Sequence, residues 1–238
     1  MGRYSTDINT SAPQPTNQNT TVLPPSNPFD QNSPGMQPQP GQQQMMGPPP
    51  GWPTDFPKPV IGLDLNGVII EDKLIDSTNN IIPINGSLEA IRSLRLKGYK
   101  VSVISDQPNI MKGLLTTQQV DNAIAYLMSI FGQNGIFTID GILYNTSSIP
   151  QDEFAKPNTG MIDKMTRETN GYINFKKGWY VGDSIDDLKM ASKAGAKPIL
   201  VLTGNGNNTL KELNRNSNKD LKKKTLVYDN LLSFANSI

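Results

Sequence analysis

An alternation of short apolar runs with amphipathic segments constrains the fold more than any other feature, and it extends from residue 59 to the end of the chain. The apolar runs are rich in β-branched side chains and predict strands at 60–65, 101–104, 139–143, 179–181, 199–202 and 226–228. Segments between them carry apolar residues at helical spacing, as at Leu88, Ile91 and Leu94. Thr116 with Gln119 offers a capping box, which predicts a helix that begins there and continues to about Phe131. Strands that are apolar on both faces and alternate with helices predict an α/β fold, a doubly wound, Rossmann-like parallel sheet with helices on both faces.

The first 58 residues differ in composition and predict a disordered N-terminal tail. They hold 13 of the 19 prolines and eight glutamines, but five charged residues and few aliphatic ones. Such a segment cannot bury enough apolar surface to offset its chain entropy. The predicted division is therefore a Pro/Gln-rich tail at 1–58 and a folded domain at 59–238. The run Pro48–Pro53, which includes Trp52, favours polyproline II and is either a solvated tether or a site for a protein partner.

The chain contains no cysteine and no histidine, which excludes several kinds of active site. Thiolate nucleophiles, Ser-His-Asp triads and metal sites built from Cys or His are ruled out. Carboxylates, lysines, hydroxyls and a hard cation such as Mg²⁺ are what remains for catalysis. The formal net charge of +1 gives no general attraction to nucleic acid or to anionic membranes. No apolar run could span a bilayer and no signal-peptide pattern is present, so we expect a cytoplasmic protein without membrane contact.

Polar side chains follow four of the predicted strands, at the point where each strand ends. In chain order they are Asp64, Asn66 and Gly67, then Ser105 and Asp106, then Lys156 after a loop, then Gly182, Asp183, Asp186 and Asp187. Ligands of doubly wound sheets bind outside the carboxyl ends of the strands, so we expect these groups to converge there. Close carboxylates repel one another unless a cation lies among them, and oxygen ligands alone indicate Mg²⁺. The pattern predicts phosphoryl transfer with Asp64 as the nucleophile.

Each of these residues, taken alone, also has a simpler explanation. An Asp after a strand is often the N-cap of the next helix, and acids in a first helical turn are favoured by the helix dipole. Ser105 could likewise be a cap, and Lys156 a solvated surface lysine. Their occurrence together, in order and each at a strand end, favours the functional interpretation.

Four short motifs resemble those of phosphatases of the haloacid dehalogenase (HAD) superfamily. They read Asp64-Leu65-Asn66-Gly67-Val68, Val103-Ile104-Ser105-Asp106-Gln107, Lys156-Pro157 and Gly182-Asp183-Ser184-Ile185-Asp186-Asp187. The segments 139–144, 155–161 and 201–204 are similar to the capless branch that contains histidinol-phosphate and heptose-bisphosphate phosphatases. The run Lys-Pro-Asn-Thr-Gly-Met also resembles the 3′-phosphatase domain of polynucleotide kinase-phosphatases. The resemblance covers residues 59–238 and implies a HAD-like fold without a large cap domain.

The resemblance implies a role for each motif residue. Asp64 would attack phosphorus and form an aspartyl-phosphate, and Asn66 would occupy the acid–base position. The ligands of Mg²⁺ would be Asp64, Asn66 through its carbonyl, Asp183 and Asp187, with Asp186 or Asp187 supporting either the ion or Lys156. The groups that bind the phosphoryl oxygens would be Ser105, Asp106, Gly67 and Lys156.

The sequence departs from the family pattern in two places. Members of the branch often fold a zinc loop from Cys and His before the lysine, but residues 145–154 contain neither, so no zinc is expected. The usual second Asp of the first motif is Asn66, whose amide orients water but cannot exchange a proton near neutral pH. General acid–base catalysis is typically worth ~10²–10⁴-fold, so turnover of alkyl phosphates should be slow.

Functions of two different classes stay open on the sequence alone. One is a slow Mg²⁺-dependent phosphomonoester hydrolase that acts on a phosphorylated small molecule of the sugar or amino-alcohol type. The other is a catalytically impaired HAD-like binding or structural module, tethered by its tail. A nucleic-acid 3′-phosphatase is a further alternative, because a capless site is open and residues 211–224 carry six basic side chains.

Overall fold

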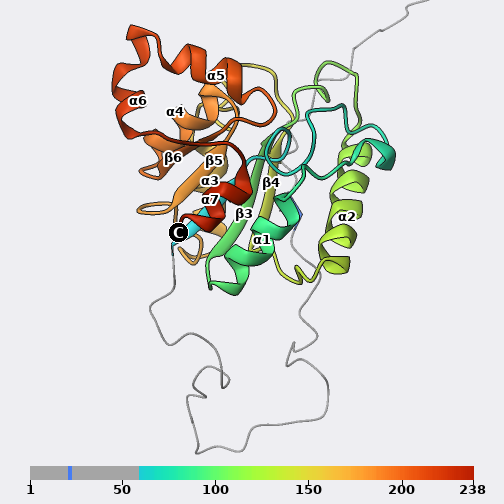
Figure 1. Ribbon diagram of the computed structural model, residues 1–238. Coiled ribbons are helices and arrows are strands. Elements are labelled where there is room, and N and C mark those ends of the chain that lie inside the picture. The colour runs from blue at the N-terminus through green and yellow to red at the C-terminus, as the bar shows by residue number, and fades with distance from the viewer. Residues whose placement is uncertain (1–20, 23–58) are drawn as a thin grey trace, which may run out of the picture.

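The sheet has the order β1-β4-β3-β2-β5-β6-β7 and lies between two layers of helices (Figure 1). The structure is a computed structural model that describes residues 59–238 and the backbone of Thr21–Val22. Its strands are β1 (Thr21–Val22), β2 (Val60–Leu63), β3 (Lys100–Asp106), β4 (Gly141–Asn145), β5 (Trp179–Gly182), β6 (Lys197–Val201) and β7 (Leu226–Tyr228). In this order, each strand from β4 to β7 is parallel to its neighbour, while β1 runs antiparallel to β4. The predicted doubly wound α/β fold is confirmed.

Helices connect the parallel strands. They are α1 (Ser87–Leu96), α2 (Thr117–Gln133), α3 (Gly160–Glu168), α4 (Ile185–Lys193), α5 (Gly206–Leu213), α6 (Lys219–Lys224) and α7 (Leu231–Asn236). Two short 3₁₀ turns, η1 (Thr78–Asn80) and η2 (Asn216–Asn218), lie in the connections. The predicted capping box opens α2, since the Thr116 side chain accepts from the Gln119 N–H while Gln119 accepts from the Thr116 N–H. Local capping chemistry therefore places this helix start correctly.

Successive strand residues pack into different layers of the core. Ile61 and Leu63 of β2 belong to the cluster covered by α1, α2 and α7, whereas Val60 belongs to the cluster beneath α3 and α4. Figure 1 shows α1 and α7 in front of the sheet. Because both faces are buried, the strands read as continuous apolar runs. Each fully buried Ile or Leu side chain contributes roughly 1.5–3 kcal/mol relative to leaving it exposed.

The strand order creates a switch point at β2. The chain passes from β2 to β3 on one side and later returns to place β5 on the other side of β2. The connections therefore diverge at the carboxyl end of β2, which opens a crevice where such folds bind ligands. Asp64 follows β2 directly and Asp183 follows β5 directly, so both lie at this crevice.

Part of the predicted tail is described. Thr21 and Val22 pair with Leu143 and Ile142 of β4, a strand the sequence did not predict because two residues carry no periodicity. The rest of the predicted tail, including Trp52 and the proline run, lies outside the described residues. Within the described ranges no helix is long and apolar enough to cross a membrane.

Candidate functional site

A polar cavity of about 320 Å³ opens at the carboxyl ends of β2, β3 and β5. The residues that line it are Asp64, Asn66, Asp72, Asp106, Lys156, Asp183, Ser184, Asp186, Asp187 and Asn205. The predicted site residues are thus brought together, except that Ser105 and Gly67 do not line the cavity. Ser105 is buried at the end of β3, with 3% of its surface exposed.

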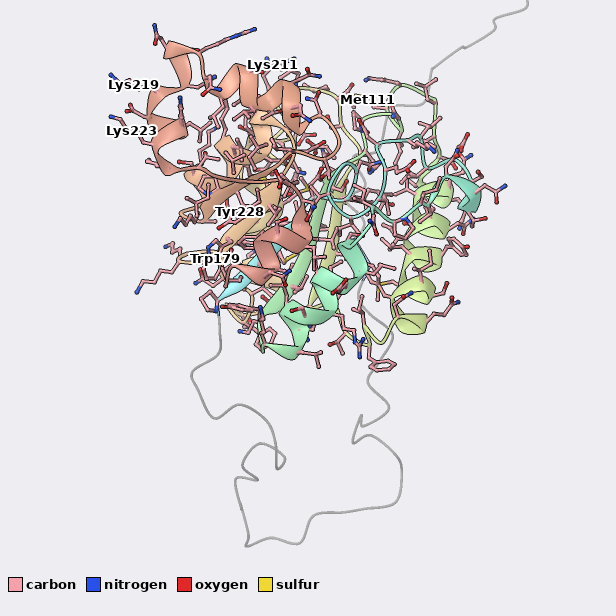
Figure 2. All side chains as sticks on the ribbon, in the orientation of Figure 1. Met111, Trp179, Lys211, Lys219, Lys223 and Tyr228 are labelled. Carbon is pink, nitrogen blue, oxygen red and sulfur yellow. The ribbon has the colours of Figure 1, made fainter. Side chains whose placement is uncertain are left out.

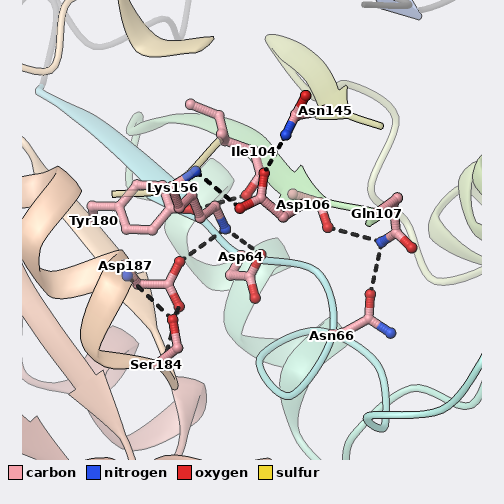
Figure 3. Close-up of polar contacts among 11 residues, drawn as sticks. Asp64, Asn66, Ile104, Asp106, Gln107, Asn145, Lys156, Tyr180, Ser184 and Asp187 are labelled. Carbon is pink, nitrogen blue, oxygen red and sulfur yellow. Dashed lines mark hydrogen bonds and ion pairs between the residues drawn. The ribbon is translucent and has the colours of Figure 1, made fainter. Parts of the chain in front are cut away.

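Lys156 is held between two carboxylates at the centre of the site. Its Nζ lies 2.6 Å from Asp64 Oδ1 and 2.8 Å from Asp187 Oδ1, as Figure 3 shows. The lysine side chain is 6% exposed, so both ion pairs are shielded from water. Burial lowers the pKa of Lys156, but Asp187 and Asp64 outweigh it and hold that pKa well above its usual value. Lys156 is therefore a fixed cation rather than a proton donor.

A third carboxylate, that of Asp183, lies close to the two that pair with this lysine. Oxygen atoms of Asp64, Asp183 and Asp187 lie within 4.8 Å of one another. Burial raises the pKa of Asp64 to about 8; Lys156 opposes this shift, and Asp187 and Asp183 add to it. Burial also raises the pKa of Asp183 to about 6, against the hydrogen bond from the Asn205 N–H. One lysine cannot balance three acids, and an all-oxygen donor set of this kind fits a divalent cation such as Mg²⁺.

Two glycines leave the space that the Asp183 carboxylate occupies. Gly67 and Gly204 have positive φ angles of 81° and 55°, and a Cβ at either position would collide with the Asp183 carboxylate. One oxygen, Asp183 Oδ2, accepts from Asn205 N at 2.7 Å, which leaves Oδ1 without a partner among the described residues. The Gly67 N–H, which was predicted to bind phosphate, already donates to Ile70 O at 2.8 Å in this structure.

Asp187 combines a structural contact with its ion pair. Its Oδ2 accepts from the N–H and hydroxyl of Ser184, and Ser184 Oγ accepts from the Asp187 N–H, which forms the capping box of α4. Its Oδ1 is the oxygen paired with Lys156. Both oxygens are thus engaged, so the predicted metal contact of Asp187 would compete with Lys156 and Ser184. The neighbouring Asp186 is half exposed and pairs loosely with Lys189 at 3.7 Å.

Asp106 contacts the chain that carries the lysine. Its Oδ2 accepts from the Lys156 N–H at 3.0 Å and its Oδ1 accepts from Asn145 Nδ2 at 3.1 Å. Burial raises the pKa of Asp106, while the nearby Lys156 lowers it. The sequence predicted a phosphate contact here, and it assigned no role to Asn145, whose only signal was its place at the end of a strand.

Asn66 and Ser105 are joined through a residue that sequence reasoning left without a role. Gln107 Nε2 donates to Asn66 Oδ1 at 2.9 Å and to Ser105 Oγ at 3.0 Å (Figure 3). Asn66 Nδ2 donates to the Lys73 carbonyl at 3.1 Å. Gln107 stands one residue after Asp106 at a strand end, the same signal that identified its neighbours.

The loop between β4 and Lys156 is stabilised by hydrogen bonds. Asn145 bonds the backbone of Ser147 in both directions, and the Ser147 hydroxyl accepts from the Ile149 N–H. Farther along, Asn158 Nδ2 donates to the carbonyls of Pro150 and Asp152. These turns fix the path of the chain from β4 to Lys156.

Comparison with known proteins places the chain in a family. Residues 153–233 match a family model described as HAD-hydrolase-like. The chain is 33% identical over 182 residues to a D-glycero-beta-D-manno-heptose-1,7-bisphosphate 7-phosphatase of Neisseria meningitidis, a match that covers 75% of this chain and 94% of the relative. The chain belongs to the HAD superfamily. The heptose-bisphosphate phosphatase of the same name from Pseudomonas putida is 30% identical over 179 residues, a match that covers 74% of this chain and 97% of that one.

Solved structures of the HAD superfamily agree with this assignment. The D,D-heptose 1,7-bisphosphate phosphatase of B. bronchiseptica, crystallised with magnesium and phosphate, aligns with a TM-score of 0.67 and 28% identity. The alignment covers 76% of this chain and 97% of that one. The Burkholderia thailandensis enzyme of the same name aligns with a TM-score of 0.57 and 27% identity. The chain is thus a HAD-type phosphatase by family, as its motifs predicted.

Proposed function

We propose that the protein hydrolyses phosphomonoesters through an aspartyl-phosphate on Asp64. The observation that carries this proposal is the buried Lys156, which pairs with Asp64 inside a polar cavity at the switch point of the sheet. A carboxylate oxygen of Asp64 attacks phosphorus, and the bond to the leaving oxygen breaks with its electron pair going to that oxygen, which takes a proton from water. The hydroxide that remains then attacks the aspartyl-phosphate, releasing inorganic phosphate and restoring Asp64. Lys156 neutralises charge on the transferred group, which is the kind of electrostatic stabilisation that phosphoryl transfer requires.

The donor set supports Mg²⁺ as the cofactor. Asp64 Oδ2 and Asp183 Oδ1 have no partner among the described residues, while the remaining oxygen of each carboxylate is engaged. These two residues would hold the ion, together with the backbone carbonyl of Asn66, and Asp187 would support Lys156 rather than the metal. When bound, the cation supplies positive charge to the phosphoryl oxygens and screens the repulsion between the acids.

A phosphorylated sugar is the substrate class that the comparisons favour. Relatives that match over nearly their whole length are named for heptose bisphosphate, and one was crystallised with phosphate. The cavity wall is polar and open, as expected for a ligand that carries hydroxyls and a phosphate. We therefore propose a sugar phosphate of the heptose-bisphosphate type as the substrate.

Two of the basic residues at 211–224 lie away from the site, which weighs against a nucleic-acid substrate. Lys211, Lys219 and Lys223 extend outward from α5 and α6 (Figure 2). Lys223 and Lys224 line a second cavity with Lys177 and Lys197, which lie at the amino ends of β5 and β6. That is the opposite edge of the sheet from Asp64, so Lys223 and Lys224 do not lead a nucleic-acid strand toward the proposed nucleophile.

A phosphate-release assay tests the activity. p-Nitrophenyl phosphate is a suitable substrate because its leaving group needs no acid. The wild-type chain should release phosphate from it only when Mg²⁺ is present. Asp64→Ala should abolish release, whereas Asp220→Ala, which removes an exposed carboxylate on α6, should leave it unchanged. Heptose 1,7-bisphosphate compared with 3′-phosphorylated oligonucleotides would test the substrate class. Absence of Asp64-dependent release at micromolar enzyme would refute the proposal.

The alternative of an inactive binding module is tested at position 66. Asn66→Asp restores a group that exchanges protons, and acid–base catalysis is worth ~10²–10⁴-fold, so release should rise by at least ~10²-fold. If neither the wild type nor Asn66→Asp releases phosphate, the result would favour the binding module instead.

A further inference from the structure

Gln107, Asn66 and Ser105 form a hydrogen-bonded group beside Asp64, here called the Gln107 network. Both hydrogens of Gln107 Nε2 are used, one by Asn66 Oδ1 at 2.9 Å and one by Ser105 Oγ at 3.0 Å. Asn66 in turn donates from Nδ2 to the Lys73 carbonyl at 3.1 Å. The network connects the end of β3 with the loop after β2, across 41 residues of sequence.

The direction of every bond in the network follows from one backbone group. The Lys73 carbonyl can only accept a hydrogen bond, so the nitrogen end of the Asn66 amide must face it. The oxygen end then faces Gln107, which must present its own nitrogen. Neither amide can rotate by half a turn without placing two like groups against each other, so the orientation of Asn66 is fixed.

Gln107 is itself firmly placed. The residue is 4% exposed, its backbone N–H donates to Asn145 O at 2.7 Å, and its carbonyl accepts from Ile110 N at 3.1 Å. A buried side chain with an anchored backbone and two donated bonds has little freedom to move. Asn66, by contrast, lines the cavity and lies on a loop, so its side chain depends on this neighbour for a single orientation.

We propose that Gln107 is a positioning residue of the active site and acts through Asn66. Asn66 Nδ2 carries a second hydrogen that has no partner among the described residues, and this residue lines the cavity with Asp64. Held in this orientation, the amide donates a hydrogen bond to the leaving oxygen. The Asp64–phosphorus bond forms, the bond to the leaving oxygen breaks, and that oxygen takes its proton from water. The proposal rests on the proposed function.

A double-mutant cycle tests this role. Gln107→Leu should lower kcat by roughly 10- to 100-fold with KM changed less than about twofold, since a misplaced group costs catalysis rather than binding. The loss should be larger for phenyl phosphate than for p-nitrophenyl phosphate, whose leaving group needs less help. In an Asn66→Ala background the same substitution should cost less than about twofold. Equal losses in the two backgrounds, or a loss carried by KM, would overturn the proposal.

Two further variants separate positioning from damage to the fold. Gln107→Glu keeps the shape but removes the donors, so it should reproduce the loss of Gln107→Leu. Gln118→Leu makes the same chemical change on the exposed face of α2, where the Gln118 side chain donates to Asn122, and should leave kcat unchanged. A Glu variant with wild-type kcat would contradict the role assigned to the Nε2 donor.

A spectroscopic measurement keeps the two proposals distinguishable. If wild-type protein shows no Asp64-dependent hydrolysis, the proposed function fails, but the Gln107 network can still be observed by NMR. The side-chain amide hydrogens of Asn66, assigned by their loss in Asn66→Ala, should exchange with solvent slowly. They should exchange at least ~10-fold faster in Gln107→Leu, because the restraint on the amide is lost. Equal exchange rates in the two proteins would overturn the positioning role.

Discussion

At the scale of single residues, the site is dominated by charges that are costly to bury alone. Lys156 compensates Asp64 and Asp187, and removing one member of a buried pair leaves the others without a counter-charge. Burial raises the pKa of Asp64, whereas the carboxylates of Asp187 and Asp64 keep the lysine charged against the effect of its own burial. The features that make Lys156 useful in catalysis therefore also make it important for stability.

Lys156→Met should destabilise the fold as well as abolish turnover. Breaking a buried pair from one side costs about 3 kcal/mol or more, and the cost should be smaller near pH 5, where the acids take up protons. Urea unfolding at two pH values measures this. Lys223→Met, which removes an exposed lysine 3.8 Å from Asp220, should cost less than about 1 kcal/mol. Similar losses for the two variants would contradict the importance of burial.

The raised carboxylate pKa values predict a pH-dependent effect of Mg²⁺. In the folded protein the pKa of Asp64 is about 8 and that of Asp183 is about 6, both above the usual 3.8. Between pH 3.8 and its raised pKa, each group binds more protons in the folded state than in the unfolded state. The stability contributed by these groups without metal is therefore greatest at low pH and is lost as pH rises through about 6 and then about 8. Mg²⁺ binds the ionised acids, so its stabilising effect should grow over the same window.

Thermal unfolding with and without Mg²⁺ measures this effect. The increase in Tm caused by Mg²⁺ should be small near pH 5 and largest at about pH 8.5. The double variant Asp64→Asn with Asp183→Asn serves as the control and should show no increase at either pH. An increase in wild-type Tm that is independent of pH would contradict the prediction.

At the scale of secondary-structure elements, the junction between β5 and α4 joins helix initiation to the site. Ser184 caps α4 and at the same time holds Asp187, which pairs with Lys156. The capping box of α2, formed by Thr116 and Gln119, has the same chemistry but does not line the site cavity. The two boxes therefore form a matched pair for experiment.

Replacing the two cap residues should separate stability from activity. Thr116→Ala and Ser184→Ala should each cost ~1 kcal/mol of unfolding free energy, the usual value of an N-cap. Only Ser184→Ala should also lower kcat, because it releases Asp187 from its fixed orientation. Urea unfolding together with phosphate release would check this, and equal effects of the two variants on kcat would show that the Ser184 contact does not matter for the site.

At the scale of the whole molecule, the described core extends through almost all of the predicted folded domain. All buried residues of the three hydrophobic clusters lie between Val60 and Ala235. The match to the Neisseria meningitidis relative covers 75% of this chain and 94% of that one, which fits a domain of about this length. We therefore propose that the tail is not required for folding or for hydrolysis.

A chain of residues 59–238 tests this division. Its Tm should stay within ~3 °C of the full chain, because that shift corresponds to less than about 1 kcal/mol in a domain of this size. Its kcat/KM on p-nitrophenyl phosphate should be unchanged. A larger fall in Tm would show that the pairing of β1 with β4 contributes to the stability of the domain.

Local patterns were enough to predict the elements and most of the residues at the site. The apolar runs predicted the parallel strands, and the box of Thr116 and Gln119 predicted the start of α2. Because ligands of such sheets bind at the carboxyl ends of the strands, Asp64, Asp183 and Lys156 were predicted to converge, and all three line one cavity. These predictions succeed because periodicity, capping and strand ends depend on residues a few positions apart.

The contacts within the site could not be predicted in this way. Asp106 meets the backbone of Lys156 across 50 residues of sequence, and Gln107 meets Asn66 across 41. The sequence by itself determined the fold class, the inventory of oxygen ligands and the substitution of an amide at position 66. Only the tertiary structure decided which oxygen of each acid is engaged and which residue orients Asn66. Hydrogen bonds and ion pairs act over a few ångströms in space, and it is the order of strands in the sheet that determines which distant residues come within that range.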